Sequence, residues 1–468
     1  MIDFVDAFLR GVGVFFLLYL ILYASYLFFS VAVGAGKLYQ RDQMQRIRNE
    51  LKHDYYVPVS ILVPAYNEQV TIADSVRSLL RLQYRLYEVI VVDDGSRDHT
   101  AEELIQAFQL RKIHRPIHRR VDCKQAREVY ETKVGPVRLT LICKDNGGKG
   151  DALNMGINAA RFPYFLCIDA DSMLQKDSLE KIVQPVLEDD GIVAVGGLIR
   201  VAQCVDMDDG AVNGYRLPLN PIIAMQVVEY DRSFLASRIL MDQFNGNLII
   251  SGAFGLFRKD VVVAAGGYDT DTLGEDMELV VKLHVFCRNN QMKYSIRYEP
   301  NAVCWSQAPT SLRDLMKQRR RWHLGLFQSM TKYWQIFGNL HFGLVGILSY
   351  LYYLLFELLS PVIEVFGLLT MTVAACFGLL NVPFMLQFFL LYSVYGAILT
   401  MTAFFQRIYT QGLRISAGDT AKAVLMCLLE GLFFRYVLSF VRVTAFLGYK
   451  RRKREWGSIK RTKQGEQT

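Results

Sequence analysis

The sequence predicts an α/β domain with a Rossmann-like, mostly parallel sheet, joined to an α-helical transmembrane region. Apolar, strand-like runs alternate with helical patterns between residues 56 and 306, as they do in parallel α/β sheets. Long uncharged segments lie on both sides of this part, and about 20 apolar residues are enough to cross a bilayer. Hydrophobic residues make up 52% of the 468-residue chain, a share that indicates a membrane protein.

The first segment, residues 1–36, is predicted to be a transmembrane helix. Residues 11–36 carry no charged side chain, and this run is too long for the core of a signal peptide. Five cations follow it: Lys37, Arg41, Arg46, Arg48 and Lys52. Because cytoplasmic flanks carry the excess of Lys and Arg, we expect the N-terminus outside and the basic linker 37–55 in the cytosol. The domain that follows the linker is then cytosolic.

Strands and helices of this domain can be followed along the chain. Strands are predicted at 57–67, 87–96, 137–146 and 164–172, and helices at 68–82, 98–110 and 150–161. The basic, aperiodic segment 111–136 is interpreted as a solvated surface excursion. Ligands of such sheets bind beyond the carboxyl ends of the strands. The polar residues expected at that edge are Asn67, Glu68, Asp93, Asp94, Lys144, Asp169 and Asp171.

Three motifs at the strand ends together indicate a nucleotide diphosphate. "DADS" places Asp169 and Asp171 where both carboxylates reach one divalent cation, although an ordinary turn gives the same pattern. "VVDDGS" is either a binding loop or a common Asp-Gly turn. "KDNGGKGDALN" puts glycines and Lys149 at a strand–helix junction, where backbone amides attract phosphate. Each motif alone is equally consistent with a structural role.

A further pair of acidic residues stands at the start of a predicted helix. In "LGEDMELVVKL" these are Glu275 and Asp276. Acids in a first helical turn are commonly capping residues, and the bare sequence favours that reading. The functional alternative is a general base beside the reacting centre.

Residues 307–342 are predicted to form interfacial amphipathic helices, with Ser311 as a helix cap. The stretch "KQRRRW" at 317–322 has two faces when it is wound as a helix. Three of its side chains share one sector by the i, i+3, i+4 rule: Gln318, Arg321 and Trp322. The other two arginines, Arg319 and Arg320, point elsewhere and are expected to meet membrane phosphates or to form structural pairs.

Residues 343–449 are predicted to be the C-terminal transmembrane region. Glu357 and Glu364 lie seven residues apart on one helical face, and they either line an exit path or pair within the bundle. The basic tail 450–468 is expected in the cytosol, which requires an even number of spans after the sheet domain. The last apolar segment contains three charged residues, so it is expected to be partly interfacial.

Seven motifs occur in this order: "VPAYNE", "VVDDGS", "NGGKGDALN", "DADS", "SGAFGLF", "GED" and "QRRRW". Together they resemble the processive, membrane-integrated glycosyltransferases of family 2, which include cellulose, chitin, hyaluronan and poly-N-acetylglucosamine synthases. The resemblance implies a GT-A glycosyltransferase domain over residues 56–306 and a polymer channel in the C-terminal transmembrane region. Many of these relatives have threonine before the acidic pair, where this chain has Gly274.

The resemblance also implies a role for each motif. The nucleotide-sugar donor would be bound by Ala65, Tyr66, Asn67, Glu68, Asp93, Asp94, Lys149 and Asp169. A Mg²⁺ or Mn²⁺ ion would be held by Asp169 and Asp171. The acceptor sugar would lie against Ser251, Gly252, Ala253, Phe254, Gly255, Glu275 and Trp322. Asp276 would be the catalytic base, and Gln318 and Arg321 would act near the pyrophosphate, as gating residues.

The implied function is a processive, inverting β-glycosyltransferase of the plasma membrane that extends an extracellular polysaccharide from UDP-glucose or UDP-N-acetylglucosamine. A second hypothesis is a non-processive transferase that adds one sugar to a lipid or other acceptor. A third is a transporter or sensor whose cytosolic domain only binds nucleotide. Expected partners are the UDP-sugar, the growing polysaccharide, the lipid bilayer and an accessory subunit. Nucleic acid is not expected as a partner, although the net charge of +8 alone does not discriminate.

Overall fold

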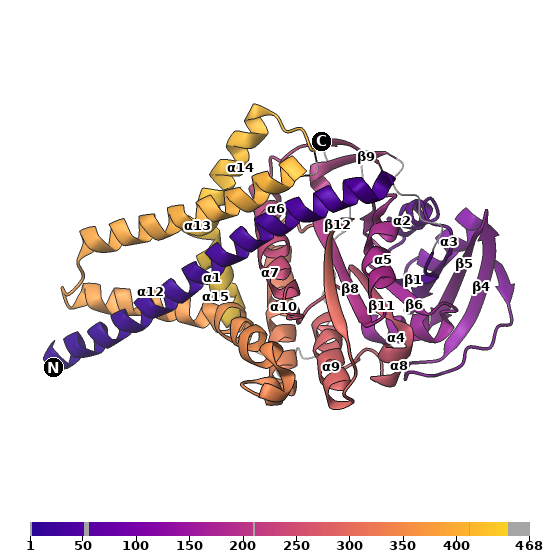
Figure 1. The fold of residues 1–468 in the computed structure, drawn as a ribbon, viewed down its shortest axis with the longest axis horizontal. Coiled ribbons are helices and arrows are strands. Elements are labelled where there is room, and N and C mark those ends of the chain that lie inside the picture. Colours follow the sequence, from indigo (N-terminus) through magenta and orange to yellow (C-terminus); the bar gives the residue numbers. More distant parts are fainter. Residues whose placement is uncertain (1, 51–55, 209–210, 411, 448–468) are drawn as a thin grey trace.

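The computed structural model describes residues 2–50, 56–208, 211–410 and 412–447. A ten-stranded sheet carries helices on both faces, and a group of long helices projects from one side of it (Figure 1). The predicted α/β domain with long apolar helices before and after it is confirmed. The predicted basic tail, residues 450–468, lies outside the described residues.

The sheet has a parallel centre. Its strands are β1 (Val59–Ala65), β2 (Tyr87–Asp93), β3 (Arg111–Ile113), β4 (Ala126–Val134), β5 (Val137–Lys144), β6 (Tyr164–Ile168), β7 (Met173–Leu174), β8 (Ile192–Val201), β11 (Phe254–Arg258) and β12 (Ser295–Ser306). They lie in the order β3-β4-β5-β2-β1-β6-β11-β8-β12-β7. Neighbours from β5 to β6 are parallel, and β11 enters antiparallel between β6 and β8. The carboxyl ends of four strands therefore meet at one edge, where the polar residues were expected.

Helices cover both faces of the sheet because its strands are apolar on both sides. In β1, Ile61 and Val63 face one layer and Leu62 faces the other. The first layer holds α2 (Ile72–Leu79), α3 (Thr100–Phe108), α5 (Ser178–Glu188) and α6 (Pro221–Arg232). The second layer holds α4 (Lys149–Ala159), α8 (Lys259–Ala264) and α9 (Glu275–Asn289). Strands that are buried twice read as continuous apolar runs, which is why the sequence reveals them.

The edge of the sheet corrects one interpretation. Residues 111–136 are not only a surface excursion, because β3 and β4 form within them and β4 pairs antiparallel along the whole of β5. An outer strand keeps one side in water, so charged side chains such as Lys112 and Glu128, which pair at 2.5 Å, are compatible with it. The basic composition of the segment gave no indication of these two strands, which lie at one edge of the sheet. A separate two-stranded hairpin is formed by β9 (Val205–Asp208) and β10 (Ala211–Tyr215).

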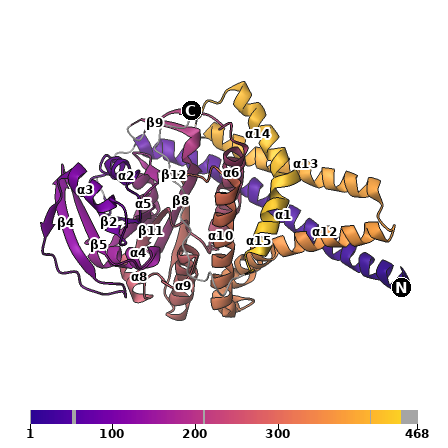
Figure 2. The same ribbon diagram turned by 180° about the vertical axis from the view of Figure 1, so that it is seen from behind.

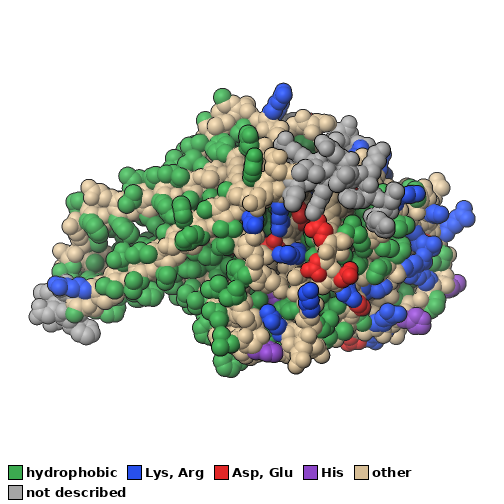
Figure 3. Space-filling view, viewed as in Figure 1, with side chains coloured by type: hydrophobic (Ala, Val, Ile, Leu, Met, Phe, Trp, Pro, Cys, Tyr) green, Lys and Arg blue, Asp and Glu red, His purple; other side chains and the backbone are tan. Residues whose placement is uncertain are grey.

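Within the described part of the chain, three helices are long and apolar enough to cross a membrane: Ala7–Arg41, Val382–Thr410 and Ala417–Thr444. The pair Val345–Leu358 and Ser360–Cys376, bent by 45°, brings the number to four if it counts as one span. Hydrophobic side chains cover the projecting helices, whereas charged ones gather over the sheet domain (Figure 3). These helices make the chain a membrane protein.

The first helix is longer than predicted. α1 (Ile2–Glu50) continues without a break through most of the segment expected to be a linker. It is fastened to α13 (Val382–Thr410) by hydrogen bonds from Tyr395 and Gln406 to its backbone. Arg41 pairs with Asp242 at 2.7 Å and so joins α1 to the sheet domain.

The long helices run in two directions. α1, α12 (Ser360–Cys376) and α13 project together away from the sheet (Figures 1 and 2). α14 (Ala417–Leu429) and α15 (Arg435–Thr444), joined by a π-helical turn, run across them. α15 packs beside α10 (Leu312–Lys332), whose predicted cap is confirmed because the Asp314 amide donates to the Ser311 hydroxyl. The crossing helices thus lie at the base of the projecting ones, where α1 and α13 also contact the sheet domain through Arg41 and Arg407.

Candidate active site

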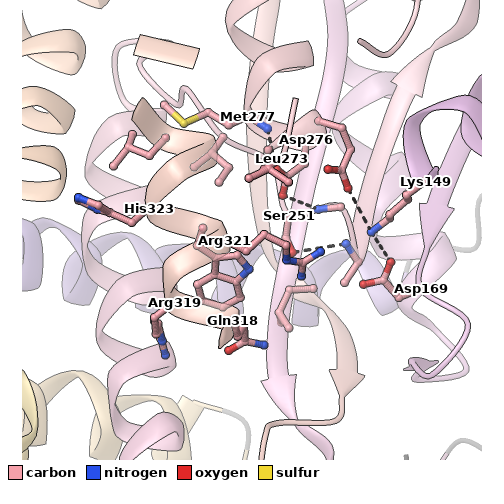
Figure 4. Close-up of a pocket in the computed structure, with 18 of the residues that line it drawn as sticks. Lys149, Asp169, Ser251, Leu273, Asp276, Met277, Gln318, Arg319, Arg321 and His323 are labelled. Atoms are coloured by element: carbon pink, nitrogen blue, oxygen red, sulfur yellow. Dashed lines mark hydrogen bonds and ion pairs between the residues drawn. The ribbon is translucent and has the colours of Figure 1, made fainter. Parts of the chain in front are cut away.

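A large cavity of about 1070 Å³ opens at the carboxyl edge of the parallel strands. Its walls come from the ends of β1 and β6, the start of α4, the loop before β11, the start of α9 and one face of α10. Figure 4 shows Lys149, Asp169 and Asp276 on one side of this space and side chains of α10 on the other. The topology therefore assembles residues that are far apart in the sequence.

The glycine loop before α4 is built around Asp94. Its carboxylate accepts backbone N–H bonds from Gly147 at 3.0 Å and Gly148 at 2.7 Å, and it forms an ion pair with Lys144. The fully buried Lys144 ammonium also pairs with Asp151 at 2.6 Å. Burial raises the pKa of Asp94, and Lys144 and the two amides oppose this shift. Asp94 thus holds the glycine loop in shape, and its carboxylate is already engaged.

Lys149 stands at the centre of a group of carboxylates. Its ammonium bonds Asp169 and lies 3.7 Å from Glu275. Burial alone would lower the pKa of Lys149, but the charges of Asp169 and Glu275 outweigh it and raise the pKa. Burial raises the pKa of Glu275, and Lys149 opposes that change. The Lys149 ammonium lies at the start of a helix, where an anionic ligand such as a diphosphate could bind it in place of these carboxylates.

The Asp276 carboxylate is oriented by two backbone amides. Gly252 donates to Oδ2 at 3.1 Å, and Met277 donates to Oδ1 at 2.8 Å. A side chain at position 252 would crowd this arrangement, because a Cβ there would lie 3.1 Å from the Lys149 ammonium. Each oxygen of the carboxylate keeps a lone pair that could accept a proton from a ligand in the cavity.

The α10 face of the cavity carries the residues of the "QRRRW" motif. Gln318, Arg321 and Trp322 line the cavity, as the helical spacing predicts. Arg319 was expected to point elsewhere, but it lines the cavity as well. The Gln318 side-chain oxygen is buried without a hydrogen-bond partner among the described residues, and Trp322 is 41% exposed. A half-exposed indole beside an unsatisfied amide suits a sugar, which offers both an apolar face and hydroxyl groups.

Arg319 forms the structural pair that was expected for it. Its guanidinium makes two bonds to Glu229, at 2.8 and 2.6 Å, and lies 4.7 Å from the centre of the Trp322 ring. Tyr230, next to Glu229 on α6, packs against the same indole, with 6.4 Å between the centres of the two rings. The sequence reasoning did not identify Glu229 or Tyr230. The one signal for them is a polar pair at the end of the mostly apolar run "PIIAMQVVEY".

Most of the predicted site residues line this one cavity. These are Ala65, Tyr66, Asn67, Glu68, Asp94, Lys149, Asp169, Asp171, Ser251, Gly252, Ala253, Glu275, Asp276, Gln318, Arg321 and Trp322. Three do not. Asp93 is buried and accepts bonds from Ser96, which closes its own turn. Phe254 and Gly255 are the first residues of the buried strand β11, where the Phe254 ring packs over Gly197.

The cavity continues from the sheet domain into the membrane helices. Beyond Trp322 its walls include Tyr26, Phe356, Glu357 and Glu364. Glu364 forms an ion pair with Arg435 at 2.7 Å, and Glu357 accepts a hydrogen bond from Tyr352 at 2.8 Å. The pairing reading is therefore confirmed for Glu364, which also lines the cavity.

Residues 60–262 match the family model described as glycosyl transferase family 2, and residues 164–406 match the one described as glycosyl transferase family group 2. Poly-beta-1,6-N-acetyl-D-glucosamine synthase of Staphylococcus aureus (strain COL) is 31% identical over 269 residues, which are 57% of this chain and 54% of that protein. The protein of the same name from Staphylococcus epidermidis is 31% identical over 276 residues, 58% of this chain and 56% of that protein. The chain spans about half the length of the curated relatives it matches.

Among solved structures, the mannosyltransferase PcManGT from Pyrobaculum calidifontis, in complex with GDP-Man and Mn²⁺, is similar with a TM-score of 0.50. The two chains are 19% identical, and the match covers 89% of this chain and 99% of that one. At this identity the likeness concerns the fold alone. Since the second family match covers more than half of the chain, the protein belongs to glycosyl transferase family group 2.

Proposed function

We propose that this family 2 glycosyltransferase is a processive, inverting enzyme that builds an extracellular β-linked polysaccharide from a UDP-sugar and moves it across the plasma membrane. The observation that carries the proposal is the continuous cavity from Asp276, past Trp322, to Glu357 and Glu364 among the membrane helices. A transferase that releases its product into the cytosol would not need this extension. The alternative, a non-processive enzyme that adds one sugar to a lipid or other acceptor, predicts a product that is one sugar longer.

In the proposed reaction Asp276 acts as general base. It accepts the proton of the acceptor hydroxyl while that oxygen attacks the anomeric carbon of the donor. The new glycosidic bond forms as the bond from the anomeric carbon to the phosphate oxygen breaks, so UDP leaves from the opposite face and the configuration inverts. The Gly252 and Met277 amides keep the carboxylate aimed, and Trp322 supports the acceptor ring.

The donor end of the cavity fits a diphosphate and a divalent cation. Asp169 and Asp171 supply two hard oxygen ligands, which Mg²⁺ or Mn²⁺ commonly combines with phosphate oxygens and water. When bound, such an ion neutralises charge on the departing diphosphate. The Lys149 ammonium contributes the same stabilisation from the chain itself. Its bond to Asp169 holds the ammonium beside one of the two proposed metal ligands.

The sugar and the membrane orientation are further parts of the proposal. The names of the matched relatives favour UDP-N-acetylglucosamine as donor, with UDP-glucose as the second candidate. We place the catalytic domain in the cytosol, α1, α12 and α13 across the membrane, and α14 with α15 along its surface. Two spans then follow the sheet domain, which satisfies the even number required by the cationic tail. An accessory subunit remains a prediction.

The test is turnover by the full chain, purified in detergent, with a panel of UDP-sugars and Mg²⁺ or Mn²⁺. Release of UDP identifies the donor, product length separates polymerisation from single transfer, and linkage-specific glycosidases identify the bond. Asp276→Asn should lower transfer by about 10²–10⁴-fold, the usual contribution of a general base, with UDP affinity nearly unchanged. Asp74→Asn, on the exposed face of α2, is the matched control. Near-normal transfer by Asp276→Asn would refute the assignment of the base.

A further inference from the structure

Two glycines meet where the segment that carries the proposed base packs on the helix that carries Trp322. Gly274 directly precedes α9, and Gly325 lies in α10. A Cβ atom on Gly325 would lie 2.8 Å from both the Cα and the N of Gly274, and one on Gly274 would lie 3.0 Å from the Cα of Gly325. Carbon atoms in contact prefer about 3.5–4 Å. Because the opposing atoms belong to the backbone, no side-chain rotation could relieve this overlap.

Neither glycine is required by its backbone angles. Gly274 has φ −126° and ψ 61°, outside the left-handed region that favours glycine. Gly325 lies within a helix, where alanine is the better helix former by about 1 kcal/mol. What both positions require is the absence of a side chain, so that two backbone segments can touch.

A hydrogen-bonded residue of α10 holds the same loop. The side-chain oxygen of Gln328 accepts bonds from the Leu273 backbone N–H at 2.8 Å and from the Thr272 hydroxyl at 3.1 Å. Gln328 follows Gly325 by three residues, so both lie on one face of α10. The loop before Asp276 is therefore docked on α10 by a close backbone contact and by a side chain one turn further along.

We propose that Gly274 and Gly325 are positioning residues that set the distance between the Asp276 carboxylate and the Trp322 ring. The inference rests on the proposed function, in which Asp276 accepts the proton of the acceptor hydroxyl and Trp322 supports the ring of the same acceptor sugar. Arg321, Trp322 and Gly325 share a face of α10, so a shift of the helix at Gly325 moves the acceptor side of the cavity relative to Asp276.

The contact gives a physical reason for the glycine in "GED". A threonine at position 274, which the resembled family often has, would not fit against the backbone of Gly325 at this separation. The close approach depends on both positions, and enlarging either one separates the base from the acceptor platform. A misplacement of about 1 Å in a reacting geometry costs up to about 100-fold in rate.

The experiment measures how the full-length enzyme divides a UDP-sugar between transfer and hydrolysis. Water needs no sugar platform, so hydrolysis reports on the donor site and the base without the acceptor platform. We expect Gly325→Ala and Gly274→Ala to lower transfer by about 10–100-fold, with UDP affinity and hydrolysis within about threefold of wild type. Gly396→Ala in α13, where an added Cβ would meet nothing within 4 Å, is the matched control and should keep the wild-type ratio.

A wild-type ratio of transfer to hydrolysis in Gly325→Ala would overturn the inference. If that variant also loses UDP binding, Gln328→Met decides, because it removes the hydrogen-bonded attachment and adds no atom at the glycine contact. Its ratio should fall several-fold, and an unchanged ratio would equally overturn the inference. Failure of the wild-type enzyme to consume any UDP-sugar would instead overturn the proposed function, so the two failures are distinguishable.

Discussion

Lys144→Met removes the positive charge from a buried cluster that also contains the carboxylates of Asp94 and Asp151. Among the described residues, Lys144 is the cation that pairs with both of them. The Lys144 side chain is fully buried, and those of Asp94 and Asp151 are 4% and 8% exposed. Loss of one partner of a buried ion pair costs about 3–5 kcal/mol, because the remaining charge is uncompensated. Asp94 keeps the amides of Gly147 and Gly148, so we expect the lower end of that range. In a domain of about 250 residues this lowers Tm by about 6–12 °C.

The assay is thermal unfolding of the purified protein in detergent, with and without UDP, at pH 5 and pH 8. Without Lys144 the buried Asp94 carboxyl should bind a proton more readily in the folded state than in the unfolded chain. Protonation of Asp94 then stabilises the folded variant most at low pH. The loss in its free energy of unfolding relative to wild type should therefore grow from pH 5 to pH 8. Lys112→Met is the matched control, because Lys112 and Glu128 form an exposed pair worth less than about 1 kcal/mol. Equal losses in the two variants would refute the reasoning.

Two further predictions concern α9 and α10. Burial lowers the pKa of His284 to about 4, whereas an unfolded histidine titrates near 6.5. The neutral, buried His284 should therefore make its full contribution to the free energy of unfolding above pH 6.5. That free energy should fall by about 3 kcal/mol as the pH is lowered towards 4. His284→Gln should flatten this fall in urea unfolding series, and an unchanged slope would contradict the prediction. Arg321→Ala should lower transfer at least about tenfold, because Arg321 lines the cavity, whereas Arg320→Ala should stay within about threefold, because Arg320 reaches towards Thr444. Equal losses in transfer assays would contradict the distinction between the two arginines.

The parallel centre of the sheet could be predicted because its strands are buried on both faces. β1 and β2 alternate their side chains between two apolar layers, so their sequences are mostly apolar and end abruptly in polar residues. That ending identifies the edge where ligands bind, and the cavity lies there. The outer strand β4 lacks this signature, since one of its edges faces only the short β3 and its sequence mixes charged and apolar residues.

The division of work between neighbouring polar residues could not be predicted. Asp93 and Asp94 are adjacent and identical, but only Asp94 points to the glycine loop, because its partner Lys144 lies 50 residues later on β5. The loop "SGAFGLF" was likewise expected to face the acceptor throughout, yet β11 begins at Phe254 and turns that ring into the sheet core. Both outcomes depend on which strand lies alongside, and the periodicity of a single segment carries no information about its neighbour.

Helix α10 shows the same limit at the site itself. Helical spacing correctly places Gln318, Arg321 and Trp322 on the cavity face. It does not reveal that the intervening Arg319 binds Glu229, 90 residues earlier on α6, and also contacts the Trp322 ring. A bidentate guanidinium–carboxylate pair fixes its two side chains more firmly than a single bond does. The motif therefore supplies the groups that we propose to meet the acceptor, but the orientation of the Trp322 indole depends on Glu229, which lies outside the motif. A chain with the sequence "QRRRW" and no acid at position 229 would hold the indole less firmly.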